Sequence, residues 1–222
     1  MKHLLISAII AIAAAIPASA QYYQIANQIP QLISPVLSGS TNYKGFVEAS
    51  YTTGLGSNKA DFLEFTTTQG FTNSAGFFMG VGAGVDVMFS HTNDGWGDNW
   101  GGVTDFDYNR SSRTTSAMIP LYSDFRFNIG GKKGPSFFID VRLGCAFLVG
   151  KDYVRIGDGY ITNQEYFYLK PTIGVRIPVS STDVKKAFNI GVTYQLLTSN
   201  YWNYYRSNTT LNSLGANISF EW

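Results

Sequence analysis

The feature that most constrains this chain is a two-residue period of apolar side chains, which runs from Tyr43 to the end of the sequence. In residues 136–149, bulky apolar residues occupy every second position, while Asp140, Arg142 and small residues fill most positions between them. Successive side chains of a strand point to opposite faces, so the pattern predicts strands with one apolar and one polar face. We expect eight strands, at residues 43–52, 61–71, 77–89, 117–129, 136–149, 166–177, 188–197 and 211–222.

Eight strands joined in simple order favour closure, because a closed sheet has no exposed edge strands. The predicted fold is therefore all-β: an eight-stranded antiparallel up-and-down transmembrane β-barrel over residues 43–222. The apolar runs are long enough for the roughly 9 to 11 tilted residues with which a strand crosses a bilayer.

The direction of the polar face decides between a soluble barrel and a membrane barrel. This face collects most of the strand glycines, whereas the other face offers large apolar residues without a break. The interior of an eight-stranded barrel is narrow and suits small residues and paired charges, while lipid-facing positions favour bulk. We therefore expect a charge network in the lumen, formed by Glu48, Glu64, Asp86, Asp124, Arg126, Asp140, Arg142, Lys170 and Arg176.

The connections between the predicted strands alternate in length. Residues 130–135 and 180–186 form short links, whereas residues 91–116, 151–165 and 200–210 are long and rich in Asp, Asn, Gly and aromatic residues. Short periplasmic turns and long extracellular loops are typical of outer-membrane barrels. The extracellular loops would carry a surplus of aromatic residues that favours glycan or protein contacts: Trp96, Trp100, Tyr108, Tyr153, Tyr160, Tyr201, Trp202, Tyr204 and Tyr205.

The first 42 residues differ from the rest. Residues 1–20 have the pattern of a signal peptide, with Lys2, an apolar run over 4–16 and small residues up to a cleavage site near Ala20. Residues 21–42 carry apolar residues at helical spacing, but Pro30 and Pro35 interrupt them. We expect this segment to be a short, partly helical arm.

The composition of the chain excludes several classes of protein. Without Lys2 the chain keeps 15 basic residues (16 less one) against 15 acidic residues, so it carries no charge surplus for a nucleic acid. The only cysteine, Cys145, cannot form an intramolecular disulfide, and on the lipid face it would act as a small apolar group. After residue 20 no stretch has the roughly 18 consecutive apolar residues of a transmembrane helix.

Two candidate sites lack the pattern that their chemistry needs. His91, the only histidine after the signal segment, follows Ser90, and some outer-membrane enzymes that modify lipid A use such a pair. Strand alternation places the two side chains on opposite faces, and no nucleophile motif surrounds them. The loop from Asp94 to Asp98 lacks the spacing and the glutamate of an EF-type calcium loop. We therefore predict no catalytic residue, no metal and no cofactor.

The sequence resembles the small outer-membrane β-barrels of Bacteroides-type bacteria, over about residues 43–222. The resemblance rests on stretches such as residues 44–48, 61–65 and 174–178, and the architecture is similar to the eight-stranded OmpA/OmpX class. The alternating end, with Ile218, Phe220 and Trp222, resembles the terminal strand that the barrel-insertion machinery reads. The resemblance implies outer-membrane lipid and that machinery as partners.

We accordingly expect an outer-membrane protein with a structural or surface-interaction role and no enzymatic activity. A narrow channel is the main alternative, and a lipid A-modifying enzyme is a further one. Fold and location alone do not decide between them, since function resides in sites grafted on a fold.

Overall fold

The computed structural model describes residues 42–56, 59–73, 76–93, 111–130, 134–150, 153–156, 159–162, 165–180, 185–198 and 210–222. The predicted signal peptide and nearly all of the predicted arm lie outside these residues. All the regular structure in the described part is β-strand. Its strands are β1 (Asn42–Leu55), β2 (Ala60–Thr72), β3 (Phe77–Asn93), β4 (Ser111–Ile129), β5 (Ser136–Val149), β6 (Tyr153–Ile156), β7 (Gly159–Thr162), β8 (Glu165–Pro178), β9 (Ala187–Thr198) and β10 (Thr210–Glu221).

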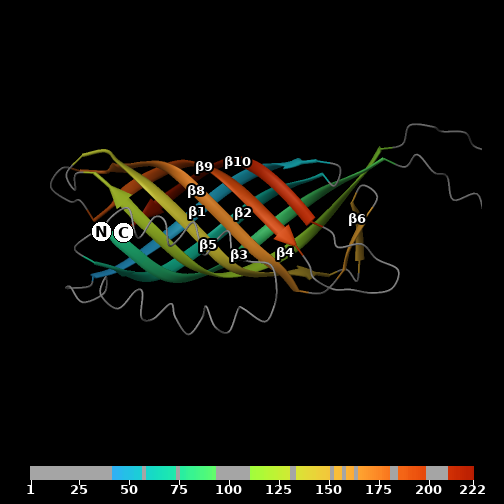
Figure 1. Ribbon diagram of the computed structural model, residues 1–222, viewed down its shortest axis with the longest axis horizontal. Helices are drawn as coiled ribbons and strands as arrows, with labels where there is room; N and C mark the ends of the chain where they lie inside the picture. Colours follow the sequence, from blue (N-terminus) through green and yellow to red (C-terminus); the bar gives the residue numbers. More distant parts are fainter. Residues whose placement is uncertain are drawn as a thin grey trace, which may run out of the picture. The chain divides into compact units, whose positions relative to one another are not determined.

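Eight of these strands form a closed antiparallel barrel, in which each strand neighbours the next one along the chain and β10 pairs with β1 (Figure 1). The predicted fold is confirmed. The strands β6 and β7 form a separate two-stranded hairpin between β5 and β8, within a segment that we predicted to be a loop. Likewise β3 and β4 extend to Asn93 and from Ser111, into the predicted loop 91–116, and they run past the other strands (Figure 1).

The register around the barrel fixes its stagger. Starting at Gly45 and following the paired residues through all eight strands, the path returns to β1 at Leu55, ten residues further along that strand (55 less 45). For eight strands this stagger corresponds to a strand tilt of about 40°. Such a barrel has an interior that side chains can fill.

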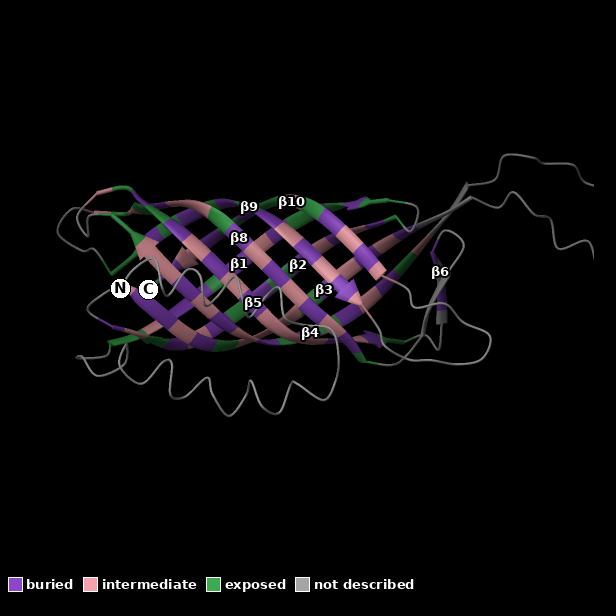
Figure 2. Ribbon diagram, in the orientation of Figure 1, coloured by how far each residue is buried: buried purple, intermediate pink, exposed green. Residues whose placement is uncertain are grey.

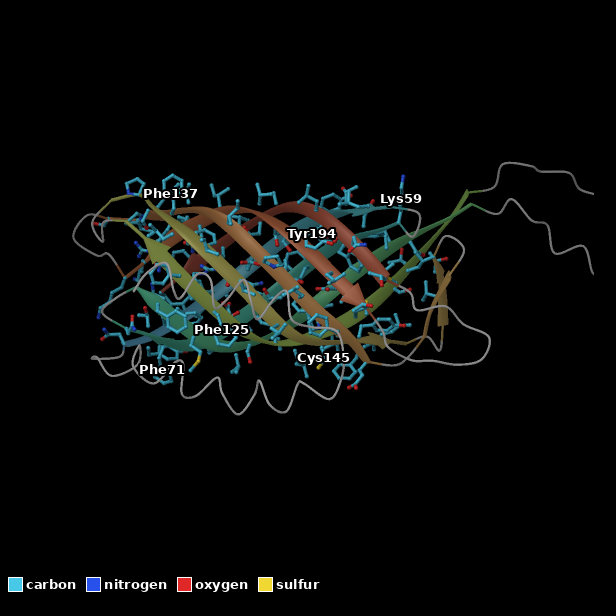
Figure 3. The ribbon with its side chains drawn as sticks, viewed as in Figure 1. Lys59, Phe71, Phe125, Phe137, Cys145 and Tyr194 are labelled. Atoms are coloured by element: carbon cyan, nitrogen blue, oxygen red, sulfur yellow. The ribbon has the colours of Figure 1, made fainter. Side chains whose placement is uncertain are left out.

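Burial alternates along each strand, so that buried and exposed bands wind around the barrel (Figure 2). The outer face is apolar, and many of its large side chains are exposed. Val81 and Phe137, for example, are each 67% exposed. Phe71, Phe137 and Cys145 project from this outer surface (Figure 3). An apolar band of this extent is stable in lipid and unfavourable in water.

The two ends of the barrel differ, and we name them for their connections. At the turn end, β2, β4 and β8 lead into β3, β5 and β9 through the short links around 73–76, 130–135 and 179–186. At the loop end, β3 leads into β4 and β9 into β10, and the β6–β7 hairpin lies between β5 and β8 in the chain. Tight turns require unusual backbone angles, and Gly76 and Gly130 supply them with φ values of 86° and 128°.

Candidate functional site: the filled lumen

The inner face of the barrel carries all nine charged residues of the predicted lumen network, and each of them is buried. Two more charged groups, Lys44 and Glu221, lie among them at the turn end. Glu221 is absent from the predicted network, although strand alternation places it on the same face as Ser219 and Asn217. The described lumen therefore holds six acidic and five basic side chains: Glu48, Glu64, Asp86, Asp124, Asp140 and Glu221 with Lys44, Arg126, Arg142, Lys170 and Arg176.

Arg142 is the centre of the network. Its two terminal nitrogens donate to the two carboxylate oxygens of Glu48, each at 2.7 Å, and Nη1 also donates to Thr66 Oγ1 at 3.3 Å. Its Nε lies 3.5 Å from Asp124 Oδ2 and 3.6 Å from Asp140 Oδ2. A two-pronged guanidinium–carboxylate pair is the strongest of the common side-chain hydrogen-bond arrangements. The pair joins β5 to β1, which lie four strands apart in either direction around the barrel.

A second pair crosses the lumen from β8 to β2, which are also opposite each other. Lys170 Nζ donates to Glu64 Oε1 at 2.5 Å and to Ser50 Oγ at 2.7 Å. Tyr168, two residues away on the same face of β8, donates its hydroxyl to Glu64 Oε2 at 2.8 Å. Both oxygens of this buried carboxylate thus have a donor, as a buried charge requires.

A third contact joins β9 to β3, again across the full width of the barrel. Gln195 Nε2 donates to Asp86 Oδ2 at 3.2 Å. Together, the three contacts β1–β5, β2–β8 and β3–β9 link opposite walls directly. Each of these contacts spans the diameter of the described lumen, so side chains occupy its centre at this level.

The turn end of the lumen is closed by stacked aromatic and basic groups. The Arg126 guanidinium lies 4.2 Å from the centre of the Phe46 ring and 4.6 Å from that of Phe138, and Nη2 donates to Asp140 Oδ2 at 3.0 Å. A desolvated guanidinium on an aromatic face is stabilised by the ring quadrupole.

Beside this stack, Glu221 connects three strands. Its Oε1 accepts from Arg176 Nε at 2.6 Å and from Lys44 Nζ at 2.9 Å. Because Lys44 lies on β1 and Glu221 on β10, this ion pair fastens the two strands whose pairing closes the barrel.

The loop end of the lumen differs from our expectation, because it is apolar. The prediction placed the polar face inside but assigned no large apolar residue to it at this end: Phe62, Met88 and Met118 share the inward parity of the charged residues and are buried. They belong to an apolar cluster that includes two residues of β6, Val154 and Ile156. Its members are Ala60, Phe62, Met88, Met118, Tyr122, Ala146, Leu148, Val154, Ile156, Tyr166, Tyr168, Leu197 and Leu211.

Most of the predicted loop aromatics lie outside the described residues: Trp96, Trp100, Tyr108, Tyr201, Trp202, Tyr204 and Tyr205. The backbone of Tyr153 lies in β6 and that of Tyr160 in β7, where the two are partners of Thr162 and Arg155. The structure therefore does not bring these side chains together in a described site.

The predicted C-terminal signal lies on the outer face. Ile218 is exposed, Phe220 and Trp222 stack with ring centres 6.3 Å apart, and Trp222 exchanges two backbone hydrogen bonds of 3.1 Å with Gly45. The indole covers Gly45, where a Cβ atom would lie 2.6 Å from the Trp222 ring.

The pair Ser90 and His91 and the Asp94–Asp98 loop are the sequence candidates for catalysis and for metal binding. Ser90 is buried and donates its hydroxyl to the Thr114 carbonyl oxygen at 3.1 Å, and the backbone of His91 pairs with Arg113. The Asp94–Asp98 loop lies outside the described residues. Within the described ranges, no group of three or more His, Cys, Asp or Glu side chains is placed to hold a metal ion. No helix long and apolar enough to span a bilayer is found in that part of the chain.

Comparisons with known proteins show the fold. No protein-family model matches the chain, and no curated protein matches its sequence. The crystal structure of Neisserial surface protein A is similar, with a TM-score of 0.54 and 10% identity over 82% of this chain and 97% of that one. More distant similarities include the outer-membrane enzyme PagL (TM-score 0.49, 11% identity, 78% and 97% covered) and OprG from Pseudomonas aeruginosa (0.43, 9%, 83% and 98%).

Similarities at about 10% identity show a shared fold and no shared activity. The closed eight-stranded antiparallel sheet with an apolar outer face is the fold that the two-residue period predicts, and this architecture is OmpA/OmpX-like. The described part of the chain has the fold of a small eight-stranded outer-membrane β-barrel.

Proposed function

We propose that the protein is a sealed outer-membrane anchor that presents its loop-end segments outside the cell for contact with a glycan or a protein. In this proposal a signal peptide is removed near Ala20, the turn end faces the periplasm, and Ile218, Phe220 and Trp222 are read by the barrel-insertion machinery. The barrel serves as a rigid support and performs no catalysis.

The observation that carries the proposal is the contact between opposite walls of the lumen. Arg142 with Glu48, Lys170 with Glu64, and Gln195 with Asp86 each span the barrel. A solute could pass only if buried charges lost their partners, which is costly in a poorly hydrated interior. Because the lumen is filled in this way, we place the function of the protein at its loop-end surface.

The strands at the loop end support this proposal. The first residue of β2, Ala60, pairs with Ser90, and the last residue of β5, Val149, pairs with Ala117 of β4. The two strands β3 and β4 continue together beyond both points, as far as Asn93 and Ser111. They form a two-stranded support for residues 94–110, which contain Trp96 and Trp100. Recognition residues are commonly carried by loops on a rigid scaffold.

The test is a binding screen of the purified, refolded barrel against arrays of host and bacterial glycans and against host surface proteins. In the test variant, residues 94–110 are replaced by a short Gly–Ser linker; in the matched control, the turn-end residues 181–184 are replaced in the same way. Folding is checked by the shift in gel mobility between unheated and heated samples. We expect a ligand that the control retains and the test variant loses.

Equal binding by both variants would contradict the assignment to this loop. Steady single-channel conductance of the unmodified protein in planar bilayers would favour the narrow channel instead. An altered lipid A mass spectrum in a deletion strain would favour the enzyme, although the buried Ser90 hydroxyl already has a structural partner.

A further inference from the structure

Two carboxyl groups lie side by side in the middle of the lumen. Glu64 of β2 and Asp86 of β3 are direct cross-strand partners that both face inward, and the two residues are 1% and 0% exposed. Side chains of such partners start only about 5 Å apart at Cβ, and these two carboxyl groups are in hydrogen-bond contact. An ionised carboxylate only accepts hydrogen bonds, so this contact requires a proton on one of the two groups.

Glu64 has the surroundings of a carboxylate. It accepts from Lys170 Nζ at 2.5 Å and from the Tyr168 hydroxyl at 2.8 Å, and Arg142 Nη1 lies 3.6 Å from its Oε1. Hydrogen bonds and nearby cations of this kind stabilise the charged form of a carboxyl group.

Asp86 has the surroundings of a carboxylic acid. The uncharged amide of Gln195 donates to its Oδ2, and its cross-strand partner on β4 is Met118. Its Oδ1 is buried and accepts no hydrogen bond from the described residues. Buried polar atoms are nearly always hydrogen-bonded, and a proton on Oδ1 satisfies this atom by donating to Glu64.

The charge count of the lumen agrees with one bound proton. Its six acidic side chains exceed its five basic ones by one (six less five). Of the two cations near the pair, Arg142 is already bonded to both oxygens of Glu48. One ammonium group thus serves two buried carboxyl groups, and a second negative charge is costly there. The groups that face the pair are Glu48 of β1, Tyr122 of β4, Arg142 of β5, Tyr168 and Lys170 of β8, and Gln195 of β9.

The pair lies next to the apolar layer of the loop end. Phe62 and Met88 are the next inward residues on the same two strands, and they are partners of each other. Tyr168, which bonds to Glu64, belongs to the apolar cluster that also contains side chains of β6. A second charge at the pair would therefore disturb the packing of this layer.

We propose that Glu64 and Asp86 form a binding site for a single proton, which makes the packing of the loop end sensitive to pH. With the proton bound, Asp86 donates from Oδ1 to Glu64, and Glu64 keeps its ion pair with Lys170. When a base in the solvent takes up the proton at high pH, two adjacent carboxylates share one ammonium group and repel each other. The strands β2 and β3 then separate at this level, and the apolar layer beside them loosens.

Infrared spectroscopy detects this proton directly, because the C=O stretch of a protonated carboxyl group is separate from the bands of a carboxylate. The barrel is refolded into lipid vesicles in H₂O and in D₂O at neutral pH and compared with Asp86→Asn. We expect a protonated-carboxyl band that shifts in D₂O and that Asp86→Asn loses. A band of equal strength in both proteins would place the proton elsewhere and refute the site.

Urea unfolding distinguishes a neutral carboxyl group from an ionised one. Asn is an uncharged analogue of protonated Asp, so Asp86→Asn should keep or raise the urea midpoint at neutral pH and remove its decline as the pH rises. Glu48→Gln is the matched control, because Glu48 is bonded to Arg142 at both oxygens, and its midpoint should fall. An equal fall for both variants, or a failure of Asp86→Asn to fold, would show that Asp86 is ionised and contradict the proposal.

Methionine methyl groups labelled with ¹³C report on the layer beside the pair. Met88 lies two residues from Asp86 on the same face, Met118 is its cross-strand partner, and Met79 lies on the outward face of β3 as a control. As the pH rises, we expect the signals of Met88 and Met118 to shift in the unmodified protein but not in Asp86→Asn, while that of Met79 stays constant. Signals that do not change with pH in the unmodified protein would refute the link to the loop end. None of these results bears on the loop 94–110, so the proposed surface function is tested separately.

Discussion

Replacing Arg142 by Met removes the central cation of the lumen while keeping an unbranched apolar stem. The change deletes two hydrogen bonds of 2.7 Å to Glu48 and one of 3.3 Å to Thr66, and it leaves a buried carboxylate without its main partner. Each bond to a charged group contributes about 1.5 to 3 kcal/mol, and breaking a buried ion pair typically costs about 3 to 5 kcal/mol. We expect the free energy of unfolding to fall by about 3 to 5 kcal/mol.

Urea unfolding of the purified barrel in lipid vesicles, followed by circular dichroism and gel mobility, measures this loss. The double variant Arg142→Met/Glu48→Gln also removes the stranded charge, so it should recover part of the stability, about 1.5 to 3 kcal/mol. Lys59→Met is the control, because Lys59 is exposed and its replacement should change the free energy by less than about 0.5 kcal/mol. A loss below about 1 kcal/mol for Arg142→Met, together with no recovery in the double variant, would refute a dry, compensated lumen.

Three further predictions concern the wall and its orientation. Val81→Arg places a charge on the lipid face and should destabilise the barrel by about 2 to 4 kcal/mol, whereas Val81→Leu should be nearly neutral in the same urea assay; equal stability would indicate that this face meets water. Gly82→Ala puts a Cβ atom 2.5 Å from the Tyr122 ring, so that ring must move, at a cost of about 1 to 3 kcal/mol, and an unaltered near-ultraviolet circular dichroism spectrum would contradict the contact. Protease added to intact cells should cut within residues 108–113 and spare 132–133, and the reverse pattern would mean the opposite orientation.

Strand alternation in the sequence sufficed to predict the barrel, because a two-residue period admits one face for lipid and one for the lumen. The prediction of the lumen residues was incomplete, because we assigned residues to a face by their chemical type. Phe62 and Met88 have the parity of Glu64 and Asp86, and Glu221 has that of Ser219, so position alone would have placed all of them inside. Whether a side chain of a barrel strand faces the lumen or the lipid depends first on its position in the strand alternation and only then on its hydrophobicity.

Partners within the lumen could not be predicted from the sequence. Glu48 and Arg142 are 94 residues apart and lie on opposite walls, so neither cross-strand pairing nor sequence spacing identifies them. Whether these two side chains come into contact depends on the ten-residue stagger between Gly45 and Leu55. This stagger is the sum of the register offsets of all the strand pairs around the barrel. The β6–β7 hairpin was missed for a related reason, since four-residue strands give too short a pattern to be distinguished from a loop.

The pairing of β1 with β10 sets how this chain can be assembled. Phe46 pairs with Glu221, 175 residues later (221 less 46), so closing the ring carries nearly the largest chain-entropy cost that the fold contains. Until that step, the amide groups along both edges have no partner, and in hydrocarbon each such group costs several kcal/mol. A half-built sheet whose edges have no partner is therefore unstable inside the bilayer, so we expect membrane insertion to be coupled to ring closure and a chain that lacks β10 to fail to insert.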